Sequence, residues 1–346
     1  NVLQKMNNLQ VITPENLNKI TTKRAGETKF FEHTTFLSNP DDVTATLANS
    51  KVKFVLFGIK EDIGILANHG RPGAKNTWEF TLKSLLNLQS NSFTKPSKVL
   101  ILGHLDFSEL YDKLSSVSAD KLIKTFRKQV ELMDQSVHQL VYSIVKAGKI
   151  PILIGGGHNN AYGVIKGCAL ALNTKMNAIN FDAHTDLRTL EGRHSGNGFS
   201  YAIKDGFLNR YFVFGLHENY TSKEILNYIE ASKLKIKYNT FEDLIVRKKV
   251  SFKKVSKKAM TFISNSKFGI EIDCDAIQNI PSSAETPSGF SANQTRQFVH
   301  YFGSHKQASY LHICEAATRI NDPHANAQTA KLLTYLITDF MNARDA

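Results

Sequence analysis

The chain has 346 residues, of which 42% are hydrophobic and 10% aromatic, so it can bury a large core and is not a disordered protein. That length allows one large α/β domain or two smaller ones, and no apolar stretch approaches the roughly 18 residues of a membrane span. The formal net charge of +12 raises the question of a nucleic-acid partner.

The N-terminal segment and the cysteines bear on location. Residues 1–14 lack a basic start followed by an apolar block, so they do not predict a signal peptide, although the sequence does not begin with Met and a targeting segment could have preceded it. Three scattered cysteines give no disulfide framework, which favours a cytoplasmic setting. Residues 1–50 are polar and predict an N-terminal extension packed on a single domain that spans 1–346.

Apolar runs that end in glycine predict the first strands, over 51–58 and 98–103. The glycine-rich segment 58–74 follows the first of them, and a loop of this length after a strand usually has a function. A helix is expected over 75–90. Residues 119–147 repeat apolar side chains at helical spacing and predict a long amphipathic helix.

The second half of the chain continues to alternate strands and helices. Helices are expected over 161–172 and 326–343, and strands over 150–154, 177–181, 210–215, 234–238, 268–272 and 310–314. About eight strands alternating with helices predict an α/β fold with a parallel sheet covered by helices on both faces. Ligand sites in such folds gather outside the carboxyl ends of the strands.

The densest basic run is Arg247-Lys248-Lys249, followed by Lys253, Lys254, Lys257 and Lys258. Apolar residues fall at helical spacing within it, so the lysines are expected on the solvated face of an amphipathic helix. We therefore expect no nucleic-acid partner, and steep salt-dependent retention on DNA or RNA would contradict this. No membrane partner is expected either.

Two clusters of acidic residues point to metal chemistry. In an extended segment alternate residues project to one side, so Asp182, His184 and Asp186 converge, as do Asp273 and Asp275. Four clustered carboxylates are unfavourable without positive charge, and two divalent cations balance four negative charges. Nitrogen and oxygen donors without thiolate favour Mn²⁺, with Fe²⁺, Co²⁺ or Zn²⁺ as alternatives.

Four motifs occur in the order found in one enzyme superfamily: Asn-His-Gly-Arg-Pro-Gly-Ala at 68–74, Gly-Gly-Gly-His at 155–158, Asp-Ala-His-Thr-Asp at 182–186 and Asp-Cys-Asp at 273–275. On these motifs the chain resembles the ureohydrolases, which comprise arginases, agmatinases and formimidoylglutamases, over about residues 55–320. The resemblance implies a three-layer α/β fold with an eight-stranded parallel sheet, and assembly as a trimer or hexamer. It also implies a binuclear manganese centre whose ligands are His158, Asp182, His184, Asp186, Asp273 and Asp275.

The expected reaction is hydrolysis of a C–N bond in an amidine or guanidine, because two cations can activate a water for attack on an electron-poor carbon. The resemblance implies that Asp186 accepts the proton of that water and that Glu315 holds the cationic end of the substrate. His194, on the loop after the metal motif, is a candidate proton shuttle because its unperturbed pKa suits the task. The alternative for His194 is an ordinary surface residue, and the alternative for Glu315 is a structural carboxylate with no contact to substrate.

Arg188 is the residue that indicates which substrate to expect. Formimidoylglutamases resemble this chain in carrying Asp-Leu-Arg, and arginine suits bidentate capture of a carboxylate. Their Ser-Gly-Thr-Pro-Phe is similar to Ser-Gly-Asn-Gly-Phe at 195–199. We therefore expect hydrolysis of N-formimidoyl-L-glutamate to L-glutamate and formamide, a step of histidine degradation. Arg193, Ser195 and Asn197 are further candidates for substrate contacts.

Two other functions stay open. A guanidino hydrolase of the arginase or agmatinase type would release urea, and Arg188 could then hold the α-carboxylate of arginine. A non-catalytic, metal-stabilised scaffold is the third reading. The chain departs from the family at Gly157, where an acidic residue is usual, at Glu271, where a small residue is usual, and in the loop 280–289.

Overall fold

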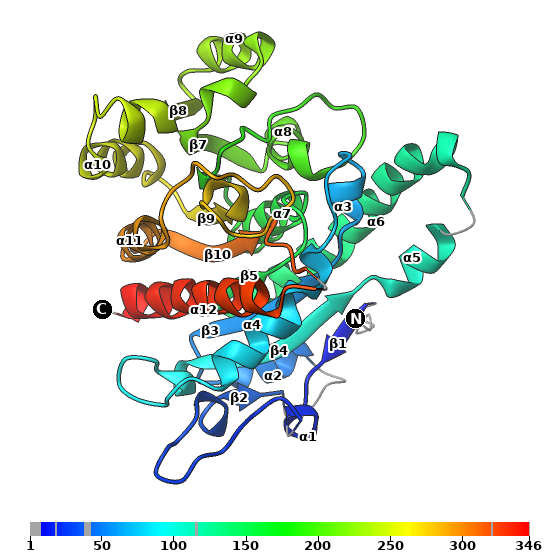
Figure 1. The fold of residues 1–346 in the computed structure, drawn as a ribbon, viewed down its shortest axis with the longest axis vertical. Coiled ribbons are helices and arrows are strands. Elements are labelled where there is room, and N and C mark those ends of the chain that lie inside the picture. The colour runs from blue at the N-terminus through cyan, green and yellow to red at the C-terminus, as the bar shows by residue number, and fades with distance from the viewer. Residues whose placement is uncertain (1–7, 18, 38–42, 115–116, 320, 346) are drawn as a thin grey trace.

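The computed structural model describes residues 8–17, 19–37, 43–114, 117–319 and 321–345 (Figure 1). Of the predicted N-terminal extension, residues 1–7, 18 and 38–42 therefore lie outside the described residues.

A single large sheet runs through the molecule, with strand order β1-β4-β3-β5-β10-β9-β6-β7-β8 and β2 paired to β4. The strands from β4 to β8 in this order are parallel to their neighbours, whereas β1 runs antiparallel to β4. This confirms the predicted parallel sheet of about eight strands, to which the N-terminal segment adds β1 and β2. The strands are β1 (Leu9–Val11), β2 (Thr35–Phe36), β3 (Phe54–Lys60), β4 (Val99–Asp106), β5 (Ile150–Ile154), β6 (Met176–Phe181), β7 (Leu208–Leu216), β8 (Ile236–Thr240), β9 (Phe268–Asp273) and β10 (Ala308–Cys314).

Helices cover both faces of the sheet and bury two separate apolar clusters against it (Figure 1). One face packs against α4, α10, α11 and α12, and the other against α2, α6, α7, α8 and α9. The helices are α1 (Pro14–Leu17), α2 (Val43–Asn49), α3 (Ile63–Leu66), α4 (Thr77–Leu86), α5 (Ser108–Leu114), α6 (Ala119–Lys146), α7 (Asn160–Leu172), α8 (Gly198–Lys204), α9 (Lys223–Ala231), α10 (Phe252–Ile263), α11 (Ala292–Gly303) and α12 (Pro323–Asp345).

Most predicted elements differ from the observed ones by a few residues at their ends, and two of these differences have a visible cause. The helix expected over 75–90 ends at Leu86. The chain beyond it instead forms backbone interactions with an N-terminal segment, because Phe30 N donates to the Leu88 carbonyl and Lys29 forms an antiparallel β-bridge with Gln89. The strand expected over 234–238 begins only at Ile236, since Leu234 lies in an exposed turn.

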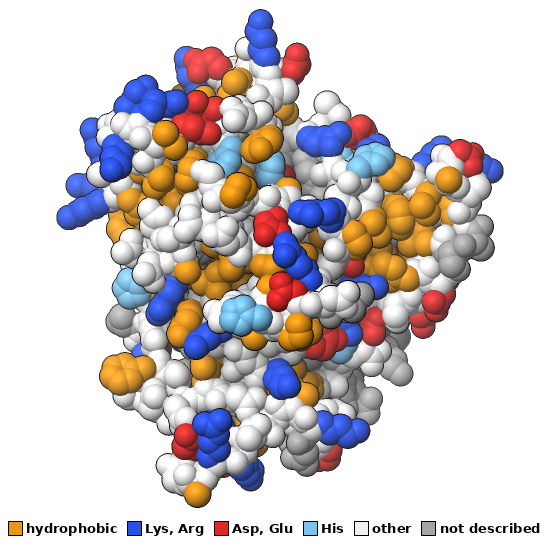
Figure 2. Space-filling model, in the orientation of Figure 1, with side chains coloured by type: hydrophobic (Ala, Val, Ile, Leu, Met, Phe, Trp, Pro, Cys, Tyr) orange, Lys and Arg blue, Asp and Glu red, His pale blue; other side chains and the backbone are white. Residues whose placement is uncertain are grey.

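The basic run forms the predicted amphipathic helix, α10. Val255, Ala259, Phe262 and Ile263 are buried against the sheet, whereas the lysines of this helix are exposed. Figure 2 shows basic side chains gathered over this part of the surface. Among the described residues, no helix is long and apolar enough to cross a membrane.

Candidate active site

Four neighbouring strands deliver the polar motifs to one edge of the sheet. His158 follows β5, Asp182 follows β6, Asp273 ends β9 and Glu315 follows β10. The strand order β5-β10-β9-β6 makes these four ends adjacent. Residues far apart in the sequence therefore converge because parallel strands share their carboxyl edge.

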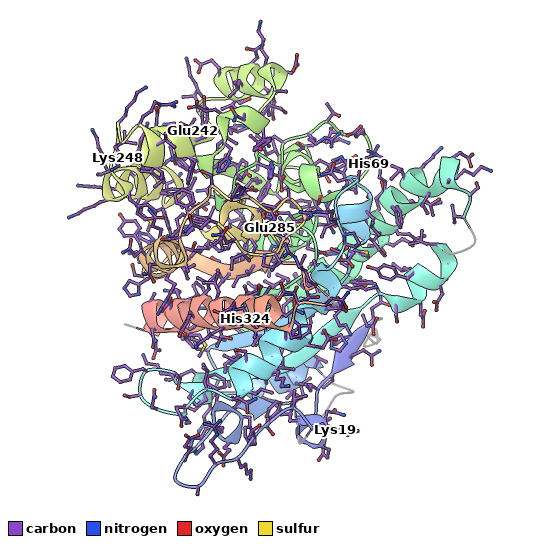
Figure 3. All side chains as sticks on the ribbon, viewed as in Figure 1. Lys19, His69, Glu242, Lys248, Glu285 and His324 are labelled. Atoms are coloured by element: carbon purple, nitrogen blue, oxygen red, sulfur yellow. The ribbon has the colours of Figure 1, made fainter. Side chains whose placement is uncertain are left out.

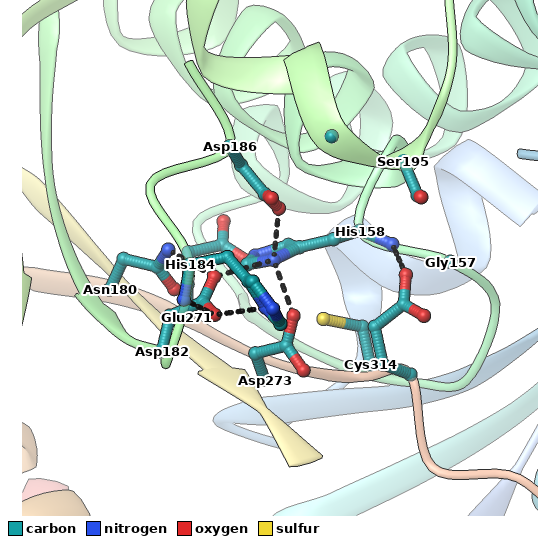
Figure 4. Close-up of polar contacts among 12 residues, drawn as sticks. Gly157, His158, Asn180, Asp182, His184, Asp186, Ser195, Glu271, Asp273 and Cys314 are labelled. Carbon is teal, nitrogen blue, oxygen red and sulfur yellow. Dashed lines mark hydrogen bonds and ion pairs between the residues drawn. The ribbon is translucent and has the colours of Figure 1, made fainter. Parts of the chain in front are cut away.

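The ring of His158 faces a group of carboxylates. Its Nδ1 lies 2.8 Å from Asp186 Oδ2, 3.1 Å from Asp273 Oδ2 and 3.4 Å from Asp182 Oδ2 (Figure 4). One ligand atom from each of these four side chains falls within 4.8 Å of all the others. An imidazole nitrogen and three carboxylate oxygens at this spacing can hold one divalent cation.

His184 stands over a second position beside the first. Its Nδ1 lies 3.5 Å from Asp182 Oδ1 and 3.9 Å from Asp275 Oδ2. Because Asp182 contacts both imidazoles through different oxygens, it connects the two positions. The six residues predicted as ligands are thus brought together at one edge of the sheet.

Bound positive charge would stabilise the ionised forms of the clustered carboxylates. Burial raises the pKa of Asp273, and the neighbouring carboxylates Asp182 and Asp275 raise it further. Burial also raises the pKa of Asp186, again helped by Asp182. For Asp182 burial acts in the same direction, but hydrogen bonds with the two histidines outweigh it and hold its pKa below the usual range. A buried set of nitrogen and oxygen donors that repel one another fits hard divalent cations.

Two site residues have a backbone conformation that non-glycine residues rarely adopt. Asp186 has φ 49° and Glu315 has φ 62°. Such positions cost about 1–3 kcal/mol each, and they persist where the surrounding structure fixes them, commonly at functional sites. Both conformations turn the chain at the edge of the sheet where the two carboxylates are presented.

Glu315 carries a buried oxygen that makes no hydrogen bond with the described residues. Its Oε1 accepts the backbone N–H of His158 at 2.6 Å, whereas its Oε2 is buried and unpaired. Burial, followed by repulsion from Asp275, raises the pKa of this carboxyl to about 8. An unpaired carboxylate oxygen beside the metal cluster is suited to a cationic ligand.

A cavity of about 550 Å³ opens onto the cluster, bounded by loops that follow β3, β6, β7 and β9. Figure 3 labels His69 and Glu285, which lie on two of these loops. The polar side chains around it include Asn68, His69, Arg71, His184, Asp186, Arg188, Ser195, Tyr220, Ser222, Asp273, Asp275, Ser283 and Glu315. Four of the six predicted metal ligands thus line the same cavity as Glu315 and Arg188.

A family model described as the Arginase family matches residues 52–342. The chain belongs to the arginase family. This confirms the resemblance to ureohydrolases that the four motifs indicated. Among curated relatives, a formimidoylglutamase of Streptococcus pyogenes serotype M12 is 24% identical over 297 residues, covering 82% of this chain and 84% of the relative. A serotype M3 formimidoylglutamase is 25% identical with the same coverage.

Solved structures confirm the arginase-family fold. Formimidoylglutamase from Bacillus subtilis superposes with a TM-score of 0.72 at 15% identity, covering 94% of each chain. Trypanosoma cruzi formiminoglutamase, solved with Mn²⁺, gives a TM-score of 0.69 at 18% identity and covers 87% of this chain and 97% of its own.

Of the predicted substrate residues, Arg188 and Ser195 line the cavity of this arginase-family member. Asn68 joins them, because its Oδ1 accepts Arg188 Nη1 at 2.5 Å and its Nδ2 donates to Ser195 Oγ at 3.2 Å. Arg188 Nη2 also donates to Glu191 at 3.0 Å. These bonds fix the half-exposed guanidinium at the cavity rim.

Arg193 and Asn197 do not line this cavity. The guanidinium of Arg193 forms a bidentate ion pair with Asp134 on α6, at 2.8 and 3.1 Å, and both side chains are buried. Asn197 accepts from Arg193 at 2.9 Å and donates to two carbonyls of the same loop. Their contacts support the loop that carries Ser195 rather than a ligand.

Arg193→Met should therefore lower stability more than it lowers substrate affinity. It leaves Asp134 buried without its cation, which costs about 3–5 kcal/mol of unfolding free energy. Urea denaturation measures this loss, and Arg296→Met is the control, since its pair with Asp339 is partly exposed and worth about 0–1 kcal/mol. Intact stability with a raised KM would instead place Arg193 at the substrate.

The role of His194 as a proton shuttle stays a prediction. The ring is buried, its Nδ1 accepts the backbone N–H of Gly196 at 3.1 Å, and its Nε2 lies 3.2 Å from Glu191. Burial, with the nearby cations Arg188 and Arg127, lowers its pKa to about 4. These contacts favour a neutral imidazole that holds the loop.

Sequence reasoning missed three contributors to the site. Asn68 belonged to a recognised motif, but its bonds to Arg188 and Ser195 carry no local signal. Glu61 accepts the backbone N–H of Gly157 at 2.7 Å. It thereby supplies a carboxylate to the turn before His158. Tyr220, on the loop after β7, had no motif to mark it.

Proposed function

We propose that the cluster binds two Mn²⁺ ions, one with His158, Asp182, Asp186 and Asp273, and the other with His184, Asp182, Asp273 and Asp275. The donor set supports this, since it contains only nitrogen and oxygen atoms and its four carboxylates balance two divalent charges. The manganese-bound state of the T. cruzi relative supports the choice of metal. Bound cations of this kind supply an activated water and Lewis-acid polarisation.

We propose that the reaction is hydrolysis of N-formimidoyl-L-glutamate to L-glutamate and formamide. The observation that carries this proposal is the cavity itself, which combines the metal cluster, the unpaired oxygen of Glu315 and the guanidinium of Arg188. The substrate has matching groups: an amidinium for Glu315 and carboxylates for Arg188. The S. pyogenes relatives named formimidoylglutamase support the same substrate.

Each protein group then has a defined task. Glu315 holds the amidinium, and its position is fixed by the N–H of His158. Water adds to the formimidoyl carbon, and the bond between this carbon and the glutamate nitrogen then breaks. The glutamate nitrogen gains one proton as it leaves, which gives the free amine of glutamate. Asp186 lies in the cavity wall and is suited to accept the proton of the attacking water and pass it to that nitrogen.

The direct test is product analysis after incubation with Mn²⁺ and N-formimidoyl-L-glutamate. Release of glutamate and formamide in equal amounts is expected. Urea from arginine or agmatine, without glutamate release, would instead identify a guanidino hydrolase. Binding of Mn²⁺ with no turnover of any of the three compounds would support the scaffold. Because agmatine has no carboxylate for Arg188, it is the least suited of the three.

Arg188→Ala should raise the KM for N-formimidoyl-L-glutamate and change kcat less. Loss of a hydrogen-bonded charge typically costs about 1.5–3 kcal/mol, or roughly 10- to 150-fold in kcat/KM. Arg188→Lys is the matched variant: it keeps the charge but loses the planar fork, so an intermediate KM is expected. Steady-state kinetics measure both, and an unchanged KM in Arg188→Ala would remove Arg188 from the substrate site.

Metal removal should make stability strongly dependent on pH. In the folded protein burial raises the pKa of Glu315 to about 8. Burial lowers the pKa of His184, but the carboxylate of Asp182 outweighs it and the pKa rises to about 10. Both groups hold protons that the unfolded chain releases, so the Tm of the chelated protein should fall as pH rises from 6.5 to 8.5. The lowered pKa of His194 acts in the opposite direction, but that contribution is complete by pH 6.5.

Added Mn²⁺ should raise the Tm most at pH 8.5, because binding requires deprotonated ligands. Thermal melts at several pH values, with and without Mn²⁺, measure both effects. A Tm of the chelated protein that rises over this range would contradict the assignment of these groups.

We further propose that the enzyme is a cytoplasmic homo-oligomer, a trimer or hexamer. Its three cysteines are buried free thiols, which suits a reducing compartment. Light scattering coupled to gel filtration measures the oligomer, and a monomer would contradict this part of the proposal.

A further inference from the structure

Behind His158, on the side away from the metal cluster, lies a buried polar group formed by β9 and β10. Glu271 and His312 are register partners on these strands, and both are fully buried. Glu271 Oε2 lies 2.6 Å from His312 Nδ1, and its Oε1 accepts the hydroxyl of Tyr310 at 2.6 Å. The same Oε2 lies 3.4 Å from Nε2 of His158 (Figure 4).

The backbone is adapted to this group. Gly269 precedes Glu271 by two residues on β9 and so lies on the same face. A Cβ atom on residue 269 would overlap the ring of Tyr310. Glycine at this position therefore lets the Tyr310 ring lie across β9 and reach Glu271. A buried carboxylate that is hydrogen-bonded to a hydroxyl and to one ring nitrogen would be costly if these partners were absent.

We propose that Glu271 is a positioning residue for the metal centre, a role that rests on the proposed two-metal site. The Oε2 atom of Glu271 faces Nε2 of His158 at 3.4 Å, and Nε2 makes no hydrogen bond with any described residue. The other ring nitrogen, Nδ1, faces Asp182, Asp186 and Asp273. A ring nitrogen that binds a cation carries no proton, so the proton of His158 is left for Nε2, beside Glu271. Tyr310 and His312 hold Glu271 in place, so the orientation of the His158 ring is supported before a cation binds.

The cation held with His158 depends on Glu271, whereas the cation held with His184 does not. His184 lies on the loop after β6, apart from the buried group on β9 and β10. Replacement of Glu271 should consequently affect one of the two metal positions.

Calorimetric titration of the chelated protein with Mn²⁺ tests the proposal. Glu271→Gln keeps the size of the side chain but replaces one accepting oxygen with an NH₂ group, which cannot accept a hydrogen bond from Tyr310 or His312. We expect one Mn²⁺ to bind roughly 10- to 100-fold more weakly, the range for outer-shell partners of metal ligands, while the other keeps its affinity. Asp339→Asn is the control, a partly buried carboxylate that pairs with Arg296 away from the cluster, and should leave both Mn²⁺ affinities unchanged.

Two unchanged affinities in a folded Glu271→Gln protein would overturn the proposal, as would equal weakening of both ions with a lower Tm. If Glu271→Gln does not fold, Tyr310→Phe removes one partner of Glu271, and weakening of the same single ion is expected. In the unaltered protein, ¹⁵N NMR of labelled histidine with Zn²⁺ in place of Mn²⁺ should show the His158 proton on Nε2. A proton on Nδ1 would overturn the assignment. These readouts are metal binding and tautomer, so they stand independently of the substrate.

Discussion

Asp182→Asn should abolish turnover and empty both metal positions. Asp182 contacts Nδ1 of His158 through one oxygen and Nδ1 of His184 through the other, so it is common to the two sites. Asparagine removes one negative charge and replaces one oxygen with an NH₂ group that cannot bind a cation. We expect kcat to fall by more than roughly 10³-fold, beyond the 10- to 100-fold typical of outer-shell partners.

Elemental analysis of the purified variant measures the metal content directly. Asp243→Asn is the control, because Asp243 lies on the surface with Arg247 and Lys249 and should keep two ions and full turnover. Two tightly bound ions in Asp182→Asn would show that this carboxylate is not shared between the sites.

Glu315→Gln should separate substrate capture from metal binding. The amide oxygen can still accept the N–H of His158, so the turn before the cluster is kept. The variant loses the negative charge that would face the amidinium. Removing one partner of a buried charge pair costs about 2–5 kcal/mol, which corresponds to roughly 30- to 4,000-fold in kcat/KM. Two Mn²⁺ ions should remain bound.

The matched control for this variant is Glu285→Gln, a partly exposed carboxylate on the loop after β9 that pairs with Arg319. Its kcat/KM should equal that of the unaltered protein. Full activity in Glu315→Gln would show that the unpaired oxygen has a role other than substrate binding, and loss of metal would show that Glu315 supports the cluster.

The convergence of the six proposed ligands could be predicted because its signal is local. Asp182, His184 and Asp186 alternate along one short segment, and Asp273 and Asp275 do the same. The apolar runs before them placed both segments at strand ends, and parallel strands bring such ends to one edge. The sheet order brought them into contact, as expected.

The rim of the cavity could not be predicted in the same way, because its contacts are long-range. Arg188 is fixed by Asn68, 120 residues earlier in the chain. Arg193, next to the metal motif in sequence, instead turns inward to Asp134 on α6. Sequence proximity to a motif therefore identified the loop, but the partner of each side chain depended on helices that pack behind it.

The central claim is that two cations in this cluster hydrolyse N-formimidoyl-L-glutamate. The measurement that tests it most directly is glutamate release by the chelated protein as Mn²⁺ is added in known equivalents. We predict no release without metal and a rise that stops at two equivalents per chain. Release that is independent of Mn²⁺, or no release at two bound equivalents, would contradict the claim.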